Sequence, residues 1–163
     1  MKNTKQNLKE FFIYAMKLDI TNFKESILND KPNESLIHFF HFLEDLFAIR
    51  EKLGQKNYEK YSVLYDYYNA LKHKDLSADL FAICKPKYAI SFPIRFDNNR
   101  NKFKYFLLTF DNIEDYMKNK KYRNGTDPNK TITNFNNFLK NKSVEEIMYL
   151  VLEETKNIEI VED

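Results

Sequence analysis

The chain has 163 residues, enough for one domain with a sizeable hydrophobic core. Its net charge of +2 excludes a generally cationic nucleic-acid-binding coat. Its single cysteine, Cys84, excludes an internal disulfide and a cysteine-based zinc site. Fifteen Phe and eleven Tyr beside only two Gly favour a packed helical body over a turn-rich β-sandwich.

Apolar residues recur at helical spacing along the first half of the chain. They predict helices over about 4–18, 21–28, 35–53 and 57–73. Gly54 supplies a C-terminal stop for the third of these helices. The two long helices are expected to pack as an antiparallel hairpin.

The second half begins with alternating apolar residues. These predict strands over 88–96 and 104–110, joined by a polar turn, and hence a small antiparallel β-hairpin or three-stranded sheet. Residues 118–128 are polar and lysine-rich, which predicts an exposed loop. Ser143 and Glu146 match a capping box, which opens a last helix that runs to about Thr155.

The expected fold is therefore mainly α with a β insertion, an α+β arrangement in one domain over 1–163. Its helical body covers about 4–75 and 143–156, and its β segment about 78–110. The N-terminus lacks the uninterrupted apolar stretch of a secretory signal, and no window approaches the ~18 apolar residues of a membrane-spanning helix. We expect a cytoplasmic protein that makes no membrane contact.

A polar cluster ends the predicted 57–73 helix. Asn69 and His73 lie one helical turn apart on one face, and Lys72 and Lys74 flank the histidine. An imidazole titrates near neutral pH, so His73 is a candidate acid or base beside a bound phosphate. The alternative is that these residues stand there only because cations are favourable at a helix C-terminus.

The run Asn-Ala-Leu-Lys-His, residues 69–73, at the end of a long hairpin helix resembles the signature of HEPN domains. In that superfamily an Arg, usually followed by a polar residue such as Asn, precedes a His by four to six residues. The resemblance covers about 33–75, and Tyr68 stands at the Arg position. It implies a homodimer formed through the helical hairpin and metal-independent RNA cleavage at the dimer interface. Many members serve in toxin–antitoxin, phage-exclusion or CRISPR systems.

In the implied chemistry a ribose 2′-OH attacks the neighbouring phosphate, His73 moves a proton, and a cation stabilises the developing charge. Tyr68 carries no charge, so Lys72 and Arg50 are the candidate cations. The predicted catalytic residues are His73, Asn69 and Lys72, and the predicted RNA-binding residues are Lys74, Arg50 and Tyr68. Three alternatives stay open: a non-catalytic RNA-binding relative, a protein-interaction module such as a phage- or mobile-element-encoded inhibitor, and a ligand-sensing helical domain.

His38 and His41 form a second constellation on the predicted 35–53 helix. They lie three residues apart, close enough to share a metal, with Glu44 and Asp45 one turn further on. Alternatively, the histidines flank an aromatic face and bond locally, or one of the carboxylates orients His73 across the hairpin. The sequence offers no third ligand at a defined spacing, so we assign neither a metal nor a cofactor.

Tyrosines are frequent in the predicted 57–73 helix and allow two interpretations. Interleaved with lysines they could stack on bases, but their spread around all helix faces favours the core or a dimer interface. These tyrosines are Tyr58, Tyr61, Tyr65, Tyr67 and Tyr68.

Overall fold

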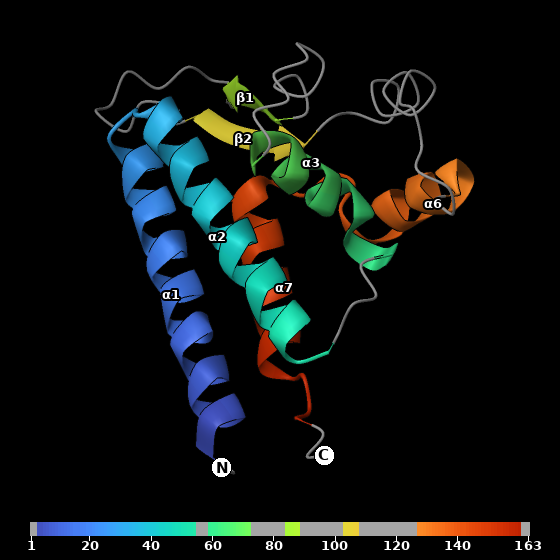
Figure 1. Ribbon diagram of the computed structural model, residues 1–163. Helices are drawn as coiled ribbons and strands as arrows, with labels where there is room; N and C mark the ends of the chain where they lie inside the picture. The colour runs from blue at the N-terminus through green and yellow to red at the C-terminus, as the bar shows by residue number, and fades with distance from the viewer. Residues whose placement is uncertain (1–2, 55–58, 73–83, 89–102, 108–126, 161–163) are drawn as a thin grey trace.

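The computed structural model describes residues 3–54, 59–72, 84–88, 103–107 and 127–160. This part of the chain is mainly helical, as the sequence predicts (Figure 1). The elements are α1 (Asn3–Leu28), α2 (Pro32–Lys52), the 3-10 helix η1 (Glu59–Tyr61), α3 (Ser62–Lys72), β1 (Cys84–Tyr88), β2 (Phe103–Leu107), α6 (Pro128–Phe138) and α7 (Val144–Lys156). None of the described helices combines the length and the apolar character that crossing a lipid bilayer requires.

α1 is one continuous helix, so the predicted division into helices over 4–18 and 21–28 is wrong. Met16, Ile20, Phe23 and Ile27 are all buried and follow one another at steps of three or four residues. Because this apolar face continues through the expected break without a Gly or Pro, the helix has no reason to end there.

A tight turn reverses the chain between α1 and α2. Asp30 adopts a positive φ of 56°, and the Lys31 N–H donates to the Ser26 carbonyl at 2.9 Å. Asp tolerates this left-handed conformation because its short polar side chain bonds locally. α2 begins earlier than predicted because Pro32 fits the first helical turn, which has no partner for its backbone nitrogen. Gly54, with φ +72°, ends α2 as predicted.

The helical hairpin consists of α1 and α2, whereas the sequence predicts it between 35–53 and 57–73. α1, α2 and α7 lie side by side, with α3 and α6 beside them (Figure 1). Residues 55–58 lie outside the described part, and the helix after them begins only at Ser62, following η1. α3 is therefore about half as long as α2 and joins it through aromatic rings, because it is too short to pair along the whole of α2.

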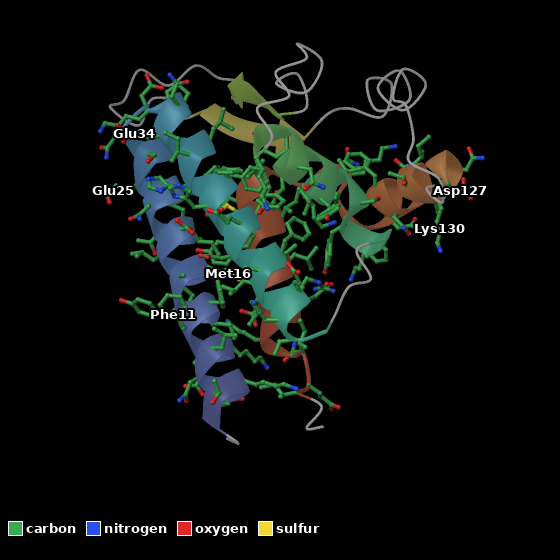
Figure 2. All side chains as sticks on the ribbon, in the orientation of Figure 1. Phe11, Met16, Glu25, Glu34, Asp127 and Lys130 are labelled. Carbon is green, nitrogen blue, oxygen red and sulfur yellow. The ribbon has the colours of Figure 1, made fainter. Side chains whose placement is uncertain are left out.

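One hydrophobic core joins these helices. Figure 2 shows Met16 pointing from α1 toward α2. The largest fully buried side chains come from α1, α2, η1 and α3; they are Met16, Phe23, Phe39, Phe42, Leu43, Leu46, Ile49, Tyr61 and Leu64. α7 contributes Val144, Ile147, Met148, Val151 and Leu152. This common core fixes the position of α1 against α2, on which the site described below depends.

The capping box predicted for α7 is confirmed: the Glu146 N–H donates to Ser143 Oγ at 3.3 Å, and the Ser143 N–H donates to Glu146 Oε2 at 2.6 Å.

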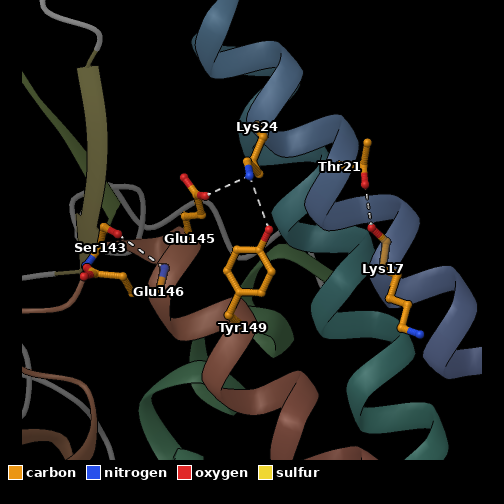
Figure 3. Close-up of polar contacts among 7 residues, drawn as sticks. All are labelled: Lys17, Thr21, Lys24, Ser143, Glu145, Glu146 and Tyr149. Atoms are coloured by element: carbon orange, nitrogen blue, oxygen red, sulfur yellow. Dashed lines mark hydrogen bonds and ion pairs between the residues drawn. The ribbon is translucent and has the colours of Figure 1, made fainter.

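Polar contacts at the surface hold α7 against α1. Lys24 of α1 lies 3.4 Å from the Tyr149 hydroxyl and 3.6 Å from a Glu145 carboxylate oxygen (Figure 3). At the other end, Lys9 donates to the carbonyls of Lys156 and Ile158, near the end of α7.

α6 was not predicted from the sequence. Asp127 caps it by accepting the Asn129 N–H at 2.9 Å, Pro128 occupies its first turn, and Phe135 is buried. The helix is short and rich in Asn and Thr, which are weak helix formers, so packing rather than propensity supports it.

β1 and β2 pair antiparallel, with Pro86 opposite Tyr105. β1 overlaps the predicted 88–96 strand only at Tyr88, and β2 overlaps the predicted 104–110 strand in part. Most of the predicted β segment, and nearly all of the predicted exposed loop, fall in 89–102 and 108–126, outside the described residues. The hairpin with its predicted strands is therefore not shown.

Candidate functional site

The end of α3 carries two of the residues predicted to act on RNA. Asn69 is half-buried, and Lys72 is exposed in the last helical turn, three residues further on. Lys72 Nζ lies 5.4 Å from the centroid of the Tyr68 ring. His73 and Lys74 lie outside the described residues. This surface therefore presents one described cation close to an amide side chain.

Tyr68 is part of the core, which differs from its predicted contact with RNA. Its side chain is 7% exposed, and its ring stacks on Phe40 with centroids 5.8 Å apart. The Phe47 ring also contacts Tyr68, with the two ring centroids 5.4 Å apart. A ring that contacts two α2 side chains and is nearly covered from solvent has the contacts of a packing residue. Tyr61 and Tyr67 are buried as well.

Arg50 lies near the beginning of α3, not near its end. Its guanidinium is 5.1 Å from the centroid of the Tyr61 ring, and Tyr61 immediately precedes α3. α3 has 11 residues. At about 1.5 Å per residue it separates Tyr61 from Lys72 by about 16 Å. Within one chain Arg50 therefore lies at the opposite end of α3 from Lys72.

A second cluster lies between α1 and α2. His38 and His41 stand one turn apart on α2, with ring centroids 6.5 Å apart, and Asp19 reaches them from α1. The distance from His38 Nδ1 to Asp19 Oδ1 is 3.9 Å. One potential ligand atom of each of the three side chains lies within 4.8 Å of the other two. The helix pair thus brings two imidazoles and one carboxylate together.

This cluster is partly withdrawn from solvent. Asp19 is 9% exposed and His38 is half-buried, whereas His41 is exposed. His38 Nδ1 is shielded from solvent and has no hydrogen-bond partner among the residues that the structure describes. Most buried polar atoms in proteins have such a partner, so an unpartnered ring nitrogen 3.9 Å from a carboxylate oxygen calls for an explanation.

Burial dominates the electrostatics of the cluster. It raises the pKa of Asp19 to about 6; repulsion from Asp45 adds to this effect and attraction to His41 opposes it. Burial also raises the pKa of Asp45 to about 6. Repulsion from Glu44 adds to this rise, and attraction to His41 opposes it. The pKa of His38 is lowered by burial and by His41. A neutral His38 keeps a lone pair available to an electrophile.

Sequence reasoning found His38 and His41 but not Asp19, which is on a different helix. One signal in the sequence points to Asp19: it interrupts the apolar face that Met16, Ile20 and Phe23 form. An acidic residue on a buried helix face needs a polar partner, and α2 supplies that partner only after the two helices pack. The suggested orientation of His73 by Glu44 or Asp45 involves a residue outside the described part.

Comparisons with protein-family models, curated proteins and solved structures find no match to this chain.

Proposed function

We propose that this chain is a cytoplasmic RNA-binding protein whose RNA contact is the C-terminal end of α3, and that it binds RNA without cleaving it. One observation carries the proposal: Lys72 is exposed in the last turn of α3, on the same side as Asn69, directly before His73 and Lys74. A lysine there contacts a phosphate as a point charge, and an amide side chain offers hydrogen bonds to the ribose or phosphate.

The same geometry argues against cleavage. The position of the HEPN Arg is occupied by Tyr68, which packs against Phe40 and Phe47. Arg50 lies at the opposite end of α3, over Tyr61. Lys72 lacks the planar guanidinium with which an Arg binds two phosphate oxygens at once while negative charge develops on the phosphate. A degenerate RNA-binding relative in a phage-defence or toxin–antitoxin setting fits these residues better than an active endoribonuclease does.

Binding of labelled single-stranded RNA at low salt tests the proposal. Lys72→Gln should weaken binding and reduce the slope of log affinity against log salt by about 1, because one phosphate contact is lost. The matched control is Lys52→Gln, a change of the same kind at another exposed lysine in a last helical turn, on α2. Equal affinities for the two variants, or no RNA binding by the unaltered chain, would contradict the proposal.

Cleavage is assayed on the same RNA in the presence of EDTA. We expect intact RNA from both the unaltered chain and His73→Ala. Products with cyclic-phosphate ends that disappear in His73→Ala would show that the chain is a metal-independent nuclease despite Tyr68, and would overturn the non-catalytic part of the proposal.

A specific observation also favours a protein-interaction role. Phe11, Tyr14 and Leu18 are 64%, 69% and 50% exposed and follow one another at helical spacing on α1. Figure 2 shows Phe11 pointing away from α2. Single exposed apolar residues are ordinary, but three in a row along one helix face form an apolar stripe that a partner would cover.

The partner proposed for this stripe is a second copy of the chain. If two α1 helices pack antiparallel with Tyr14 near the two-fold axis, Phe11 faces Leu18 of the partner subunit. Glu10 then lies near Lys17 of the partner subunit, so the contact is complementary in charge as well as apolar. This would be a homodimer formed through the α1 face of the hairpin.

Light scattering after size exclusion tests this contact. We expect a dimer mass for the unaltered chain and a monomer mass for Tyr14→Glu, since a charge at the axis would face its own copy. Ile37→Glu is the matched control, because Ile37 is 52% exposed on α2, and it should remain dimeric. A monomeric unaltered chain, or a Tyr14→Glu dimer, would rule the contact out.

A further inference from the structure

We propose that Asp19, His38 and His41 form a binding site for a divalent transition-metal ion, with Zn²⁺ as the favoured ion, that ties α1 to α2. The proposal goes beyond RNA binding and involves a different surface. Two imidazole nitrogens and one carboxylate oxygen are ligands that suit Zn²⁺. Ca²⁺ and Mg²⁺ prefer sites made of oxygen ligands, which this cluster does not offer. Three protein ligands leave a fourth tetrahedral position for water.

The distances suit such an ion after small side-chain movements. Zn²⁺ bonds to nitrogen and oxygen at about 2.0–2.1 Å, which places tetrahedral ligands about 3.3 Å apart. His38 Nδ1 and Asp19 Oδ1 are already 3.9 Å apart, and one donor atom of each residue lies within 4.8 Å of the others. His41 is exposed, so its ring can turn toward the other two without displacing core side chains.

The unpartnered ring nitrogen is an independent observation that points to a ligand. Within the described part of the chain His38 Nδ1 is shielded from solvent without a hydrogen bond, and it lies 3.9 Å from Asp19 Oδ1. A bound cation would take its lone pair. A cation would also offset the repulsion between the Asp19 and Asp45 carboxylates.

The position of the cluster suggests what the ion does. Asp19 lies in the C-terminal half of α1, and His38 and His41 lie in the N-terminal half of α2, so the ligands bridge the hairpin across the interface. The separation in sequence means that only the folded hairpin presents all three ligands. Metal binding therefore adds directly to the stability of the α1–α2 pair.

Calorimetric titration of the full chain with Zn²⁺, after treatment with EDTA and removal of the chelator, tests the proposal. We expect one ion per chain with micromolar or tighter affinity and a rise in Tm on adding Zn²⁺. Asp19→Asn keeps the shape of the side chain but removes its charge, and His41→Ala alters an exposed position. Each should weaken Zn²⁺ binding at least about tenfold.

Glu25→Gln is the matched control, because it removes one exposed carboxylate from α1 and should bind Zn²⁺ as the unaltered chain does. Circular dichroism checks that each variant keeps its helix content. Equal Zn²⁺ affinity in the unaltered chain, Asp19→Asn and His41→Ala would overturn the proposal. So would an absence of micromolar binding. Neither result alters the Lys72 test of RNA binding.

Discussion

Asp45 lies one turn beyond His41 on α2, and burial raises the pKa of its carboxyl to about 6. Repulsion from Glu44 adds to the shift and attraction to His41 opposes it, while Asp45 in turn raises the pKa of Asp19 on α1 by repulsion. Because the folded-state pKa is above the unfolded value, the stability that this group contributes is fully present below about pH 4 and is lost as pH rises through about 6. Ionised Asp45 therefore destabilises the fold at neutral pH.

Replacing Asp45 by Asn should remove that loss in the metal-free chain. Between about pH 4 and about pH 7.5, the unfolding free energy of the unaltered chain should fall by about 1–2 kcal/mol more than that of Asp45→Asn. Urea unfolding in EDTA at the two pH values measures the difference. Glu51→Gln, at an exposed carboxylate of α2, is the control for a general charge effect. Parallel pH profiles for Asp45→Asn and the unaltered chain would contradict the prediction.

At the scale of elements, caps decide where several helices begin and end. Gly54 ends α2, Asp127 begins α6, and the reciprocal bonds of Ser143 and Glu146 begin α7. Each cap satisfies backbone groups that have no partner inside the helix. These signals operate within a few residues, which is why the beginning of α7 could be predicted closely.

Ser143→Ala should lower the unfolding free energy by about 1 kcal/mol, because the Glu146 N–H loses its acceptor. Ser26→Ala makes the same chemical change at another buried serine and should have a smaller effect. The Ser26 hydroxyl donates to the Asn22 carbonyl inside α1, at 2.9 Å, so it does not bond to the unpaired backbone groups at a helix end. Thermal unfolding of both variants measures the difference, and equal losses would mean that the cap adds nothing.

At the scale of the whole molecule, α2 is the central element. It contacts α1, α3 and α7, and its buried residues Phe39, Phe42, Leu43 and Leu46 line the common core. The Phe39 ring stacks on Tyr67 of α3 with centroids 5.6 Å apart. A change at one of these positions therefore disturbs the packing of several helices at once.

Leu46→Ala should destabilise the fold by about 2–5 kcal/mol, because Leu46 is fully buried and its truncation leaves a cavity among several helices. Ile37→Ala on the same helix is the control. Ile37 is 52% exposed, so its truncation should change stability by only about 0.5 kcal/mol. Chemical denaturation compares the two, and similar losses would mean that α2 is not the centre of the core.

The predictions from sequence were reliable for features that residues close together in the chain decide. Helical periodicity indicated α2 and the two halves of α1, although the break between those halves was wrong, and the capping box indicated α7. The exchange of hairpin partner, α1 in place of α3, could not be predicted, because periodicity shows which face of a helix is buried but not which helix covers it. The functional assignments to Asn69, Lys72, His73 and Lys74 stay predictions.

In both candidate sites, some contacts come from spacing within one helix and others from packing between helices. Asn69, Lys72 and His73 are close together because one helix spaces them, and the pairing of His38 with His41 has the same local origin. Packing of the aromatic rings decided that Tyr68 is buried and that Arg50 lies near Tyr61. Asp19 meets the histidines only when α1 folds back on α2. Helix periods and caps act over a few residues and are legible in the sequence, whereas contacts between helices depend on burial of the whole core and exist only in the tertiary structure.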